Sequence, residues 1–185
     1  MRSWALVTGG GVRLGREICL AFAKAGWNVA CHYNLSESAA LNVCDEVRAL
    51  GVDAIAVQGA LDDETSCHNI FNVTLKTTGH HLHCIVNNAS LFVPDTGDSF
   101  DEAQALAQFK VNLMAPMHFG KWLVELDRQP ATVQSQHTAL NLLWSTCLIK
   151  RCLTSILITS LTPSPNWHWS VPSVCKPNLL HRHCA

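Results

Sequence analysis

A glycine-rich turn near the start of the chain is the first feature with a chemical use. Residues 4–8 read as a short buried strand, and the run Thr8-Gly9-Gly10-Gly11-Val12-Arg13-Leu14-Gly15 leads from it into a helical pattern. Backbone N–H groups at a helix N-terminus, with no side chains in the way, can bind a pyrophosphate. Such a run can be only a tight turn, but its place between a strand and a helix indicates a nucleotide site. We assign Thr8, Gly9, Arg13, Leu14 and Gly15 to it.

Two asparagine motifs follow. Asn87-Asn88-Ala89-Ser90 ends an apolar segment, where amide side chains can tie neighbouring strands together and hold a cofactor. The alternative is a plain turn, which is disfavoured because the glycine-rich turn occurs in the same chain. Asn112 lies in Lys110-Val111-Asn112-Leu113, inside an apolar helical segment, where a buried amide needs a hydrogen-bond partner. Taken alone, Asn112 could equally be a surface residue.

Strands and helices alternate over the first two thirds of the chain. The pattern predicts strands at residues 4–8, 28–33, 53–58 and 84–87. It predicts helices at 14–25, from Ser36 or Ser38 to about 50, from Asp62 or Thr65 to about 77, and from 99 to about 126 with a break near Pro116. This alternation is typical of βαβ units with right-handed crossovers. The fold class is α/β, a Rossmann-like doubly wound parallel sheet truncated after about four strands and followed by an irregular tail.

Composition limits the classes of protein to consider. The length of 185 residues fits one domain, and the 48% hydrophobic content is enough for a core. The net charge of −1 gives no reason to expect a nucleic acid or an anionic membrane as partner. No signal peptide or membrane span is visible, so we expect a cytoplasmic protein.

The nine cysteines are expected to be reduced thiols, because the chain has no Cys-x-x-Cys and reads as cytoplasmic. Cys19, Cys31, Cys44 and Cys84 have apolar neighbours and are predicted core residues. The segment 80–84, His-His-Leu-His-Cys, could suggest a metal site, but no second ligand cluster lies at a usual zinc spacing. We predict no metal.

The three motifs together resemble the short-chain dehydrogenase/reductase family over residues 4–126. The family's Thr-Gly-x-x-x-Gly-x-Gly appears here as Thr8-Gly9-x-x-x-Arg13-x-Gly15, and its Asn-Asn-Ala-Gly as Asn87-Asn88-Ala89-Ser90. These departures, with His32-Tyr33 and Phe92, resemble the pteridine reductase branch. The resemblance implies a partial NADP(H)-binding domain over 4–126, a pterin or folate-like substrate and a homo-oligomer.

The resemblance also implies roles for single residues. Arg13 would reach the cofactor phosphates and the substrate, and Ser90 the nicotinamide end. Phe92 would stack on the pterin, a flat heteroaromatic. Asn112 matches the family's helix asparagine, which supports a proton relay through the catalytic lysine.

The end of the second predicted strand bears on the choice of cofactor. No acidic residue stands there to hold the ribose of NAD. The predicted contacts on the adenosine side are His32, Tyr33, Asn34 and Ser36, of which His32, Asn34 and Ser36 could hold a phosphate. We therefore predict NADP(H), although Ala60 stands where the family usually has an adenine-contacting Asp.

The family's proton donor is missing. A hydride reduction needs an acid, supplied in this family by Tyr-x-x-x-Lys, but Tyr33 is the one tyrosine and no Tyr, Asp or Glu follows Asp127. The predicted function is an NADPH-dependent short-chain oxidoreductase resembling pteridine or dihydrofolate reductases, without its catalytic pair in this chain. The alternative is a non-catalytic, truncated nucleotide-binding protein.

We interpret the atypical tail, residues 127–185, as an out-of-frame translation. If codons are formed from the last base of each codon and the first two of the next, Trp144 to Trp169 permit VNMLDQKVFNLNPDYFSYTLSKLAL. That peptide contains Tyr-x-x-x-Lys with the branch's Asp upstream. Its final Leu-Ala-Leu follows from residues 166–169 whatever codons are used. The shift would lie between residues 126 and 143.

The loss of the later strands has a structural consequence. We expect the fourth strand or its neighbour to have an unpaired edge, which invites aggregation. Four of the tail's prolines, at positions 163, 165, 172 and 177, disfavour a strand in its last part. We therefore expect a poorly soluble chain with a loosely packed tail.

Overall fold

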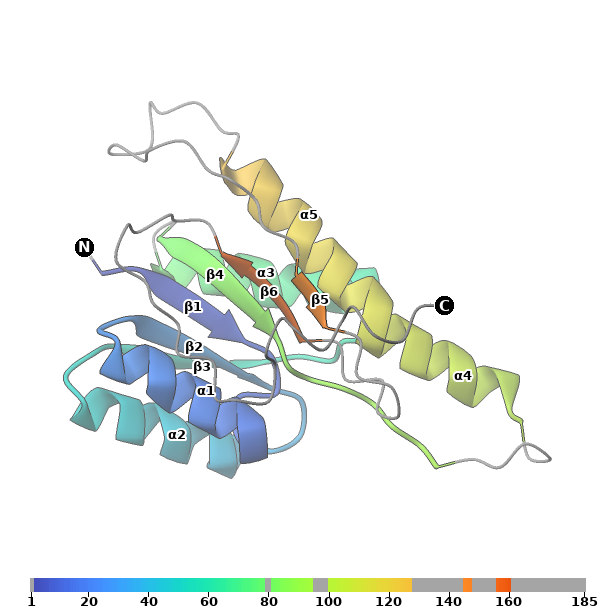
Figure 1. Cartoon of the computed structure of the whole chain (residues 1–185), viewed down its shortest axis with the longest axis horizontal. Coiled ribbons are helices and arrows are strands. Elements are labelled where there is room, and N and C mark those ends of the chain that lie inside the picture. Colours follow the sequence, from blue (N-terminus) through green and yellow to red (C-terminus); the bar gives the residue numbers. More distant parts are fainter. Residues whose placement is uncertain (1, 79–80, 95–99, 128–144, 148–155, 161–185) are drawn as a thin grey trace, which may run out of the picture.

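A six-stranded sheet forms the centre of the molecule. The computed structural model describes residues 2–78, 81–94, 100–127, 145–147 and 156–160. Four strands run parallel: β1 (Trp4–Val7), β2 (Asn28–Tyr33), β3 (Ala54–Gln58) and β4 (Leu82–Asn87). The strand order is β3-β2-β1-β4-β6-β5 (Figure 1). The predicted strands are confirmed to within two residues at their ends.

Helices cover both faces of the sheet, as predicted. One layer contains α1 (Arg13–Lys24) and α2 (Glu37–Ala49). The opposite layer contains α3 (Glu64–Thr78) and α5 (Ala115–Asp127), and α4 (Glu102–Phe109) extends α5 beyond the sheet (Figure 1). The fold is therefore a Rossmann-like, doubly wound α/β sheet.

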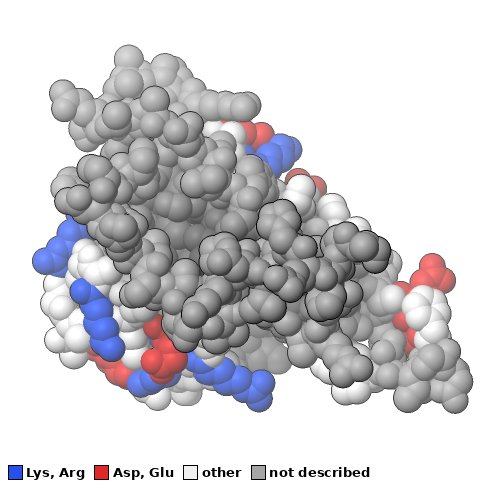
Figure 2. Space-filling view, in the orientation of Figure 1, with Lys and Arg blue, Asp and Glu red and all other residues white. Residues whose placement is uncertain are grey.

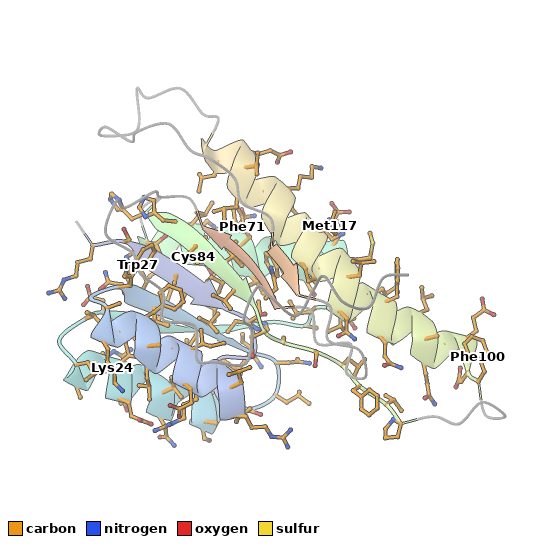
Figure 3. All side chains as sticks on the ribbon, in the orientation of Figure 1. Lys24, Trp27, Phe71, Cys84, Phe100 and Met117 are labelled. Atoms are coloured by element: carbon orange, nitrogen blue, oxygen red, sulfur yellow. The ribbon has the colours of Figure 1, made fainter. Side chains whose placement is uncertain are left out.

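The sheet separates two hydrophobic cores. Every residue of β1, β2 and β4 is buried, as expected for central strands covered on both faces. Cys19, Cys31, Cys44 and Cys84 lie in the core beneath α1 and α2, with free thiols, so their predicted structural role is confirmed. Figure 3 shows Cys84 on β4, where burial raises the pKa of its thiol to about 12.

The outer edge of β4 is paired, which corrects the expectation of an open edge at this strand. Strand β6 (Ile156–Ser160) pairs antiparallel with Cys84–Asn87, and β5 (Ser145–Cys147) pairs antiparallel with β6. The segment Ile-Leu-Ile-Thr-Ser is rich in strand-forming residues and ends before Pro163, so it keeps its backbone donors. The rest of the tail, where most of the out-of-frame interpretation falls, lies outside the described residues.

The long helical segment is irregular one turn earlier than predicted. A π-helical segment, η1 (Lys110–Met114), joins α4 to α5, and Pro116 follows it. Pro116 has no N–H to donate to the carbonyl one turn before it. A wider turn at this place carries Asn112 at its centre, buried. Such single π-turns are frequent at functional sites.

Charges of both signs are mixed over α1 and α2. Lys and Arg side chains lie beside Asp and Glu side chains on the described part of this face (Figure 2). Arg16 pairs with Glu46, and Arg48 pairs with Asp45. Within the described ranges, no helix is both long enough and apolar enough to cross a membrane.

Candidate nucleotide site

The residues after β1 and after β4 are tied together, as the two motifs predicted. The Thr8 hydroxyl accepts hydrogen bonds from the N–H groups of Asn88, at 3.0 Å, and Ala89, at 3.1 Å. The Asn88 side chain donates from Nδ2 to the carbonyls of Thr8, at 3.0 Å, and Gly9, at 3.1 Å. These bonds hold the glycine-rich turn against the end of β4.

Two glycines are required by this geometry. Gly9 has a φ of 62°, in the left-handed region that favours glycine. At Gly15, in the first turn of α1, an added Cβ would lie 2.1 Å from the Gly9 carbonyl oxygen and 2.7 Å from Asn88 Nδ2. Helix α1 can therefore approach the turn only because Gly15 has no side chain.

The N-terminus of α1 has the character of an anion site. Its N-cap residue, Val12, makes no side-chain capping bond, and its first turn contains no acidic residue. By contrast, Asp101 caps α4 through the N–H groups of Ala103 and Gln104. The free N–H groups and the helix dipole at α1 suit a pyrophosphate. The residues present therefore fit a dinucleotide.

Arg13 and Leu14 lie at this N-terminus with exposed side chains. Arg13 has a φ of 49°, and it is the one non-glycine residue with positive φ in the described part of the chain. A left-handed conformation costs an L-residue about 1–2 kcal/mol. Backbone strain of this kind clusters at binding sites.

The predicted adenosine-side residues divide into two groups. Asn34 and Ser36 are exposed in the loop after β2, where a ligand could reach them. Tyr33 is buried, and its hydroxyl donates to Glu37 Oε1 at 3.3 Å. The sequence did not point to Glu37, at the start of α2, as the partner of Tyr33, because Glu37 stands four residues beyond the end of the strand.

His32 does not present a free nitrogen to a phosphate. Its ring is 1% exposed; Nδ1 accepts from the Gly9 N–H at 3.2 Å, and Nε2 lies 3.0 Å from the Gly59 carbonyl oxygen. Burial lowers the pKa of His32 to about 4, so the ring is neutral near pH 7. The sequence prediction that it could hold a phosphate does not agree with these contacts.

The segment after β4 exposes the predicted substrate residues. Asn87 is buried at the end of β4, whereas Ser90 is exposed and Phe92 is 64% exposed. Asn112 bonds to the backbone of Leu91 in both directions: its Oδ1 accepts from the Leu91 N–H and its Nδ2 donates to the Leu91 carbonyl, each at 2.8 Å. The predicted need for a partner is confirmed, and the surface alternative is wrong because Asn112 is 7% exposed.

Asn112→Ala should destabilise the fold, because it leaves both backbone groups of Leu91 without their bonds to Asn112. We expect the free energy of unfolding to fall by about 2–3 kcal/mol in a urea titration. Asn69→Ala, at an exposed position of α3, is the control and should change it by less than about 0.5 kcal/mol. Equal losses in the two variants would contradict this role for Asn112.

Among the described residues, no three His, Cys, Asp or Glu side chains converge as metal ligands. The site is thus formed by backbone groups, amides, a hydroxyl and Arg13.

Two solved structures share the fold. A short chain dehydrogenase from Burkholderia cenocepacia in complex with NADP superposes with a TM-score of 0.64 at 30% identity, covering 66% of this chain and 50% of that one. The promiscuous reductase LugOII, which catalyses keto-reduction at C1 during lugdunomycin biosynthesis, gives a TM-score of 0.62 at 27% identity, with 66% and 51% covered.

Two curated relatives are described as a reductase and a reductase-like protein. Hydroxynaphthalene reductase-like protein Arp2 of Metarhizium robertsii is 33% identical over 122 residues, which are 62% of this chain and 45% of that protein. The 3-oxoacyl-acyl-carrier-protein reductase FabG of Staphylococcus aureus is 36% identical over 91 residues, 49% of this chain and 37% of that protein. The chain thus spans less than half the length of these relatives.

The family model described as short chain dehydrogenase matches residues 3–132, which contain the glycine-rich turn and both asparagine motifs. This chain therefore belongs to that family of oxidoreductases.

Proposed function

We propose that this chain is the nucleotide-binding part of an NADPH-dependent reductase. The observation that carries the proposal is the uncapped N-terminus of α1 beside a glycine turn that is fixed from β2 and from the end of β4. When bound, NADPH would supply the hydride. Arg13, Asn34 and Ser36 offer side chains for its phosphates. The bound NADP of the Burkholderia cenocepacia relative supports the choice.

The proposed substrate is a pterin or a folate-like molecule. Phe92 and Ser90 are exposed after β4, and Arg13 is exposed across the turn. An aromatic face at Phe92 would stack on a flat heteroaromatic ring, and a guanidinium at Arg13 would hydrogen-bond to its carbonyl. We place the protein in the cytoplasm, where thiols such as those of its buried cysteines stay reduced.

Titration of the full chain with NADPH and with NADH, followed by nucleotide fluorescence, tests the cofactor proposal. NADPH should bind at least about fivefold more tightly. Glu37→Gln should increase this preference by a factor of about two to three, because it removes a carboxylate near the expected 2′-phosphate. A folded sample that binds neither nucleotide would overturn the proposal.

Arg13→Gly should change stability and binding in opposite directions. Glycine relieves the positive φ, so we expect the free energy of unfolding to rise by up to about 1 kcal/mol. NADPH should bind about tenfold more weakly, because a charge-assisted contact to phosphate is lost. Calorimetric titration beside thermal unfolding measures both. Arg48→Gly, at the far end of α2, is the control and should leave NADPH affinity unchanged; Arg13→Gly with unchanged affinity would remove Arg13 from the phosphate site.

We also propose that two copies associate through the α4–α5 side. Among the apolar residues exposed there are Leu106, Phe109, Leu113 and Met117, which are spaced three or four positions apart. Figure 3 shows Met117 on α5. Leu113→Glu with Met117→Glu should convert a dimer to a monomer in light scattering at micromolar concentration. A wild-type chain that is monomeric at that concentration would contradict this.

A further inference from the structure

His32 lies where three strand ends meet. Its own carbonyl accepts from the Gly10 N–H at 2.9 Å, while its ring binds the Gly9 N–H through Nδ1 and the Gly59 carbonyl through Nε2. Gly9 belongs to the turn after β1, and Gly59 follows β3. One buried side chain at the end of β2 therefore connects the glycine-rich turn to the loop that follows β3.

The hydrogen bonds define the state of the ring. Nδ1 accepts a hydrogen bond from the Gly9 N–H, so the ring hydrogen of the neutral form is on Nε2, which donates a hydrogen bond to the Gly59 carbonyl oxygen. The peptide groups of Gly9 are then held from both sides, because the Gly9 carbonyl accepts from Asn88 Nδ2. A turn with a glycine at positive φ has many alternative conformations, and these two contacts select one of them.

We propose that His32 is a positioning residue that sets the glycine-rich turn for the nucleotide by holding the Gly9 N–H, while Gly59 fixes the ring. The inference rests on the proposed nucleotide-binding function. His32 acts through the Gly9 backbone and touches no phosphate itself. It therefore differs from the phosphate contact that the sequence suggested.

Two near-isosteric variants separate the two ring nitrogens. Asn places its Oδ1 close to the position of Nδ1, so His32→Asn keeps an acceptor for Gly9 and loses the donor to Gly59. Gln places its Nε2 close to the position of the ring Nε2, so His32→Gln keeps the donor and loses the acceptor. His68→Gln, at an exposed position of α3, is the control for the substitution itself.

The test measures NADPH affinity, thermal stability and amide exchange at Gly9 in the full chain. His32→Asn should bind NADPH within about threefold of wild type, and His32→Gln at least about tenfold more weakly at a comparable melting temperature. Without nucleotide, exchange of the Gly9 amide should be faster in His32→Gln than in His32→Asn. Nitrogen NMR of the wild type should show the Nε2–H tautomer of His32.

Other outcomes overturn the inference. Equal affinities in the two variants would do so, as would losses of affinity that only follow losses of melting temperature. If the folded wild type binds no NADPH, the proposed function fails. The Gly9 amide then still decides the His32 contact: equal exchange in both variants rejects it, and selective loss of protection in His32→Gln supports it.

Discussion

Restoring the alternative reading frame downstream of about residue 130 should convert the chain into an active reductase. With dihydrobiopterin or dihydrofolate, we expect NADPH oxidation by the restored protein to exceed that of the present chain by at least about 10³-fold. A positioned general acid alone contributes about 10²–10⁴ in rate. If the tail is an out-of-frame translation, the restored segment would return Asp, Tyr and Lys together.

No residue of the described site can replace that acid. Tyr33 lies on β2, and β1 separates β2 from β4 in the sheet. Burial and the neighbouring Glu37 carboxylate both raise the pKa of Tyr33, which makes its hydroxyl a weaker acid. The buried Asn112 amide donates to the Leu91 carbonyl and has no acidic proton to give.

One further variant and two outcomes of the comparison test the missing acid. The restored protein with its Tyr replaced by Phe should lose activity and keep NADPH binding. Equal, substantial rates from the present chain and the restored one would show that residues 127–185 carry chemistry of their own. A folded restored protein without any rate would count against the pterin or folate substrate.

The front half of the fold could be predicted because its signals are local. The strands are continuous apolar runs, and the glycine-rich turn follows the first of them directly. That amides of the asparagine motif would tie neighbouring strands together followed from the rule that carboxyl ends of parallel strands meet at one edge. Every one of these inferences uses residues close together in sequence or a fixed rule of topology.

The direction in which His32 points could not be predicted. Every residue of β2 is buried, so no alternation of polar and apolar residues distinguishes its two faces. A polar side chain inside such a strand must find a partner, and the partners of His32 are backbone groups of Gly9 and Gly59. Almost every residue carries the same backbone groups, so a backbone hydrogen-bond partner cannot be recognised from the residue type.

The pairing of β6 with β4 was missed for a different reason. The run Leu148–Leu161 is apolar without clear spacing, so it fixes neither register nor direction. An antiparallel strand needs no crossover helix, so it can join the sheet without the strand–helix alternation that marks the first four strands. The prolines that argued against a strand all lie after Ser160.

Gly15→Ala should abolish most nucleotide binding, because one methyl group has no room at this position. The new Cβ would lie 2.1 Å from the Gly9 carbonyl oxygen, far inside contact distance, so α1 and the turn must move apart. We expect NADPH affinity to fall at least about 100-fold and the free energy of unfolding to fall by about 1–3 kcal/mol. Gly15→Asp should bind no NADPH at all, since its carboxylate would also repel the pyrophosphate.

Gly26→Ala separates the steric effect from the general cost of replacing a glycine. Gly26 has a φ of 82°, but no atom lies within 4 Å of an added Cβ. It should therefore lose about 1 kcal/mol of stability through backbone strain and bind NADPH as the wild type does. Fluorescence titration and urea unfolding of the two alanine variants give both quantities. If Gly15→Ala matches Gly26→Ala in affinity as well as in stability, the close approach of α1 to the Gly9 carbonyl is not what forms the site.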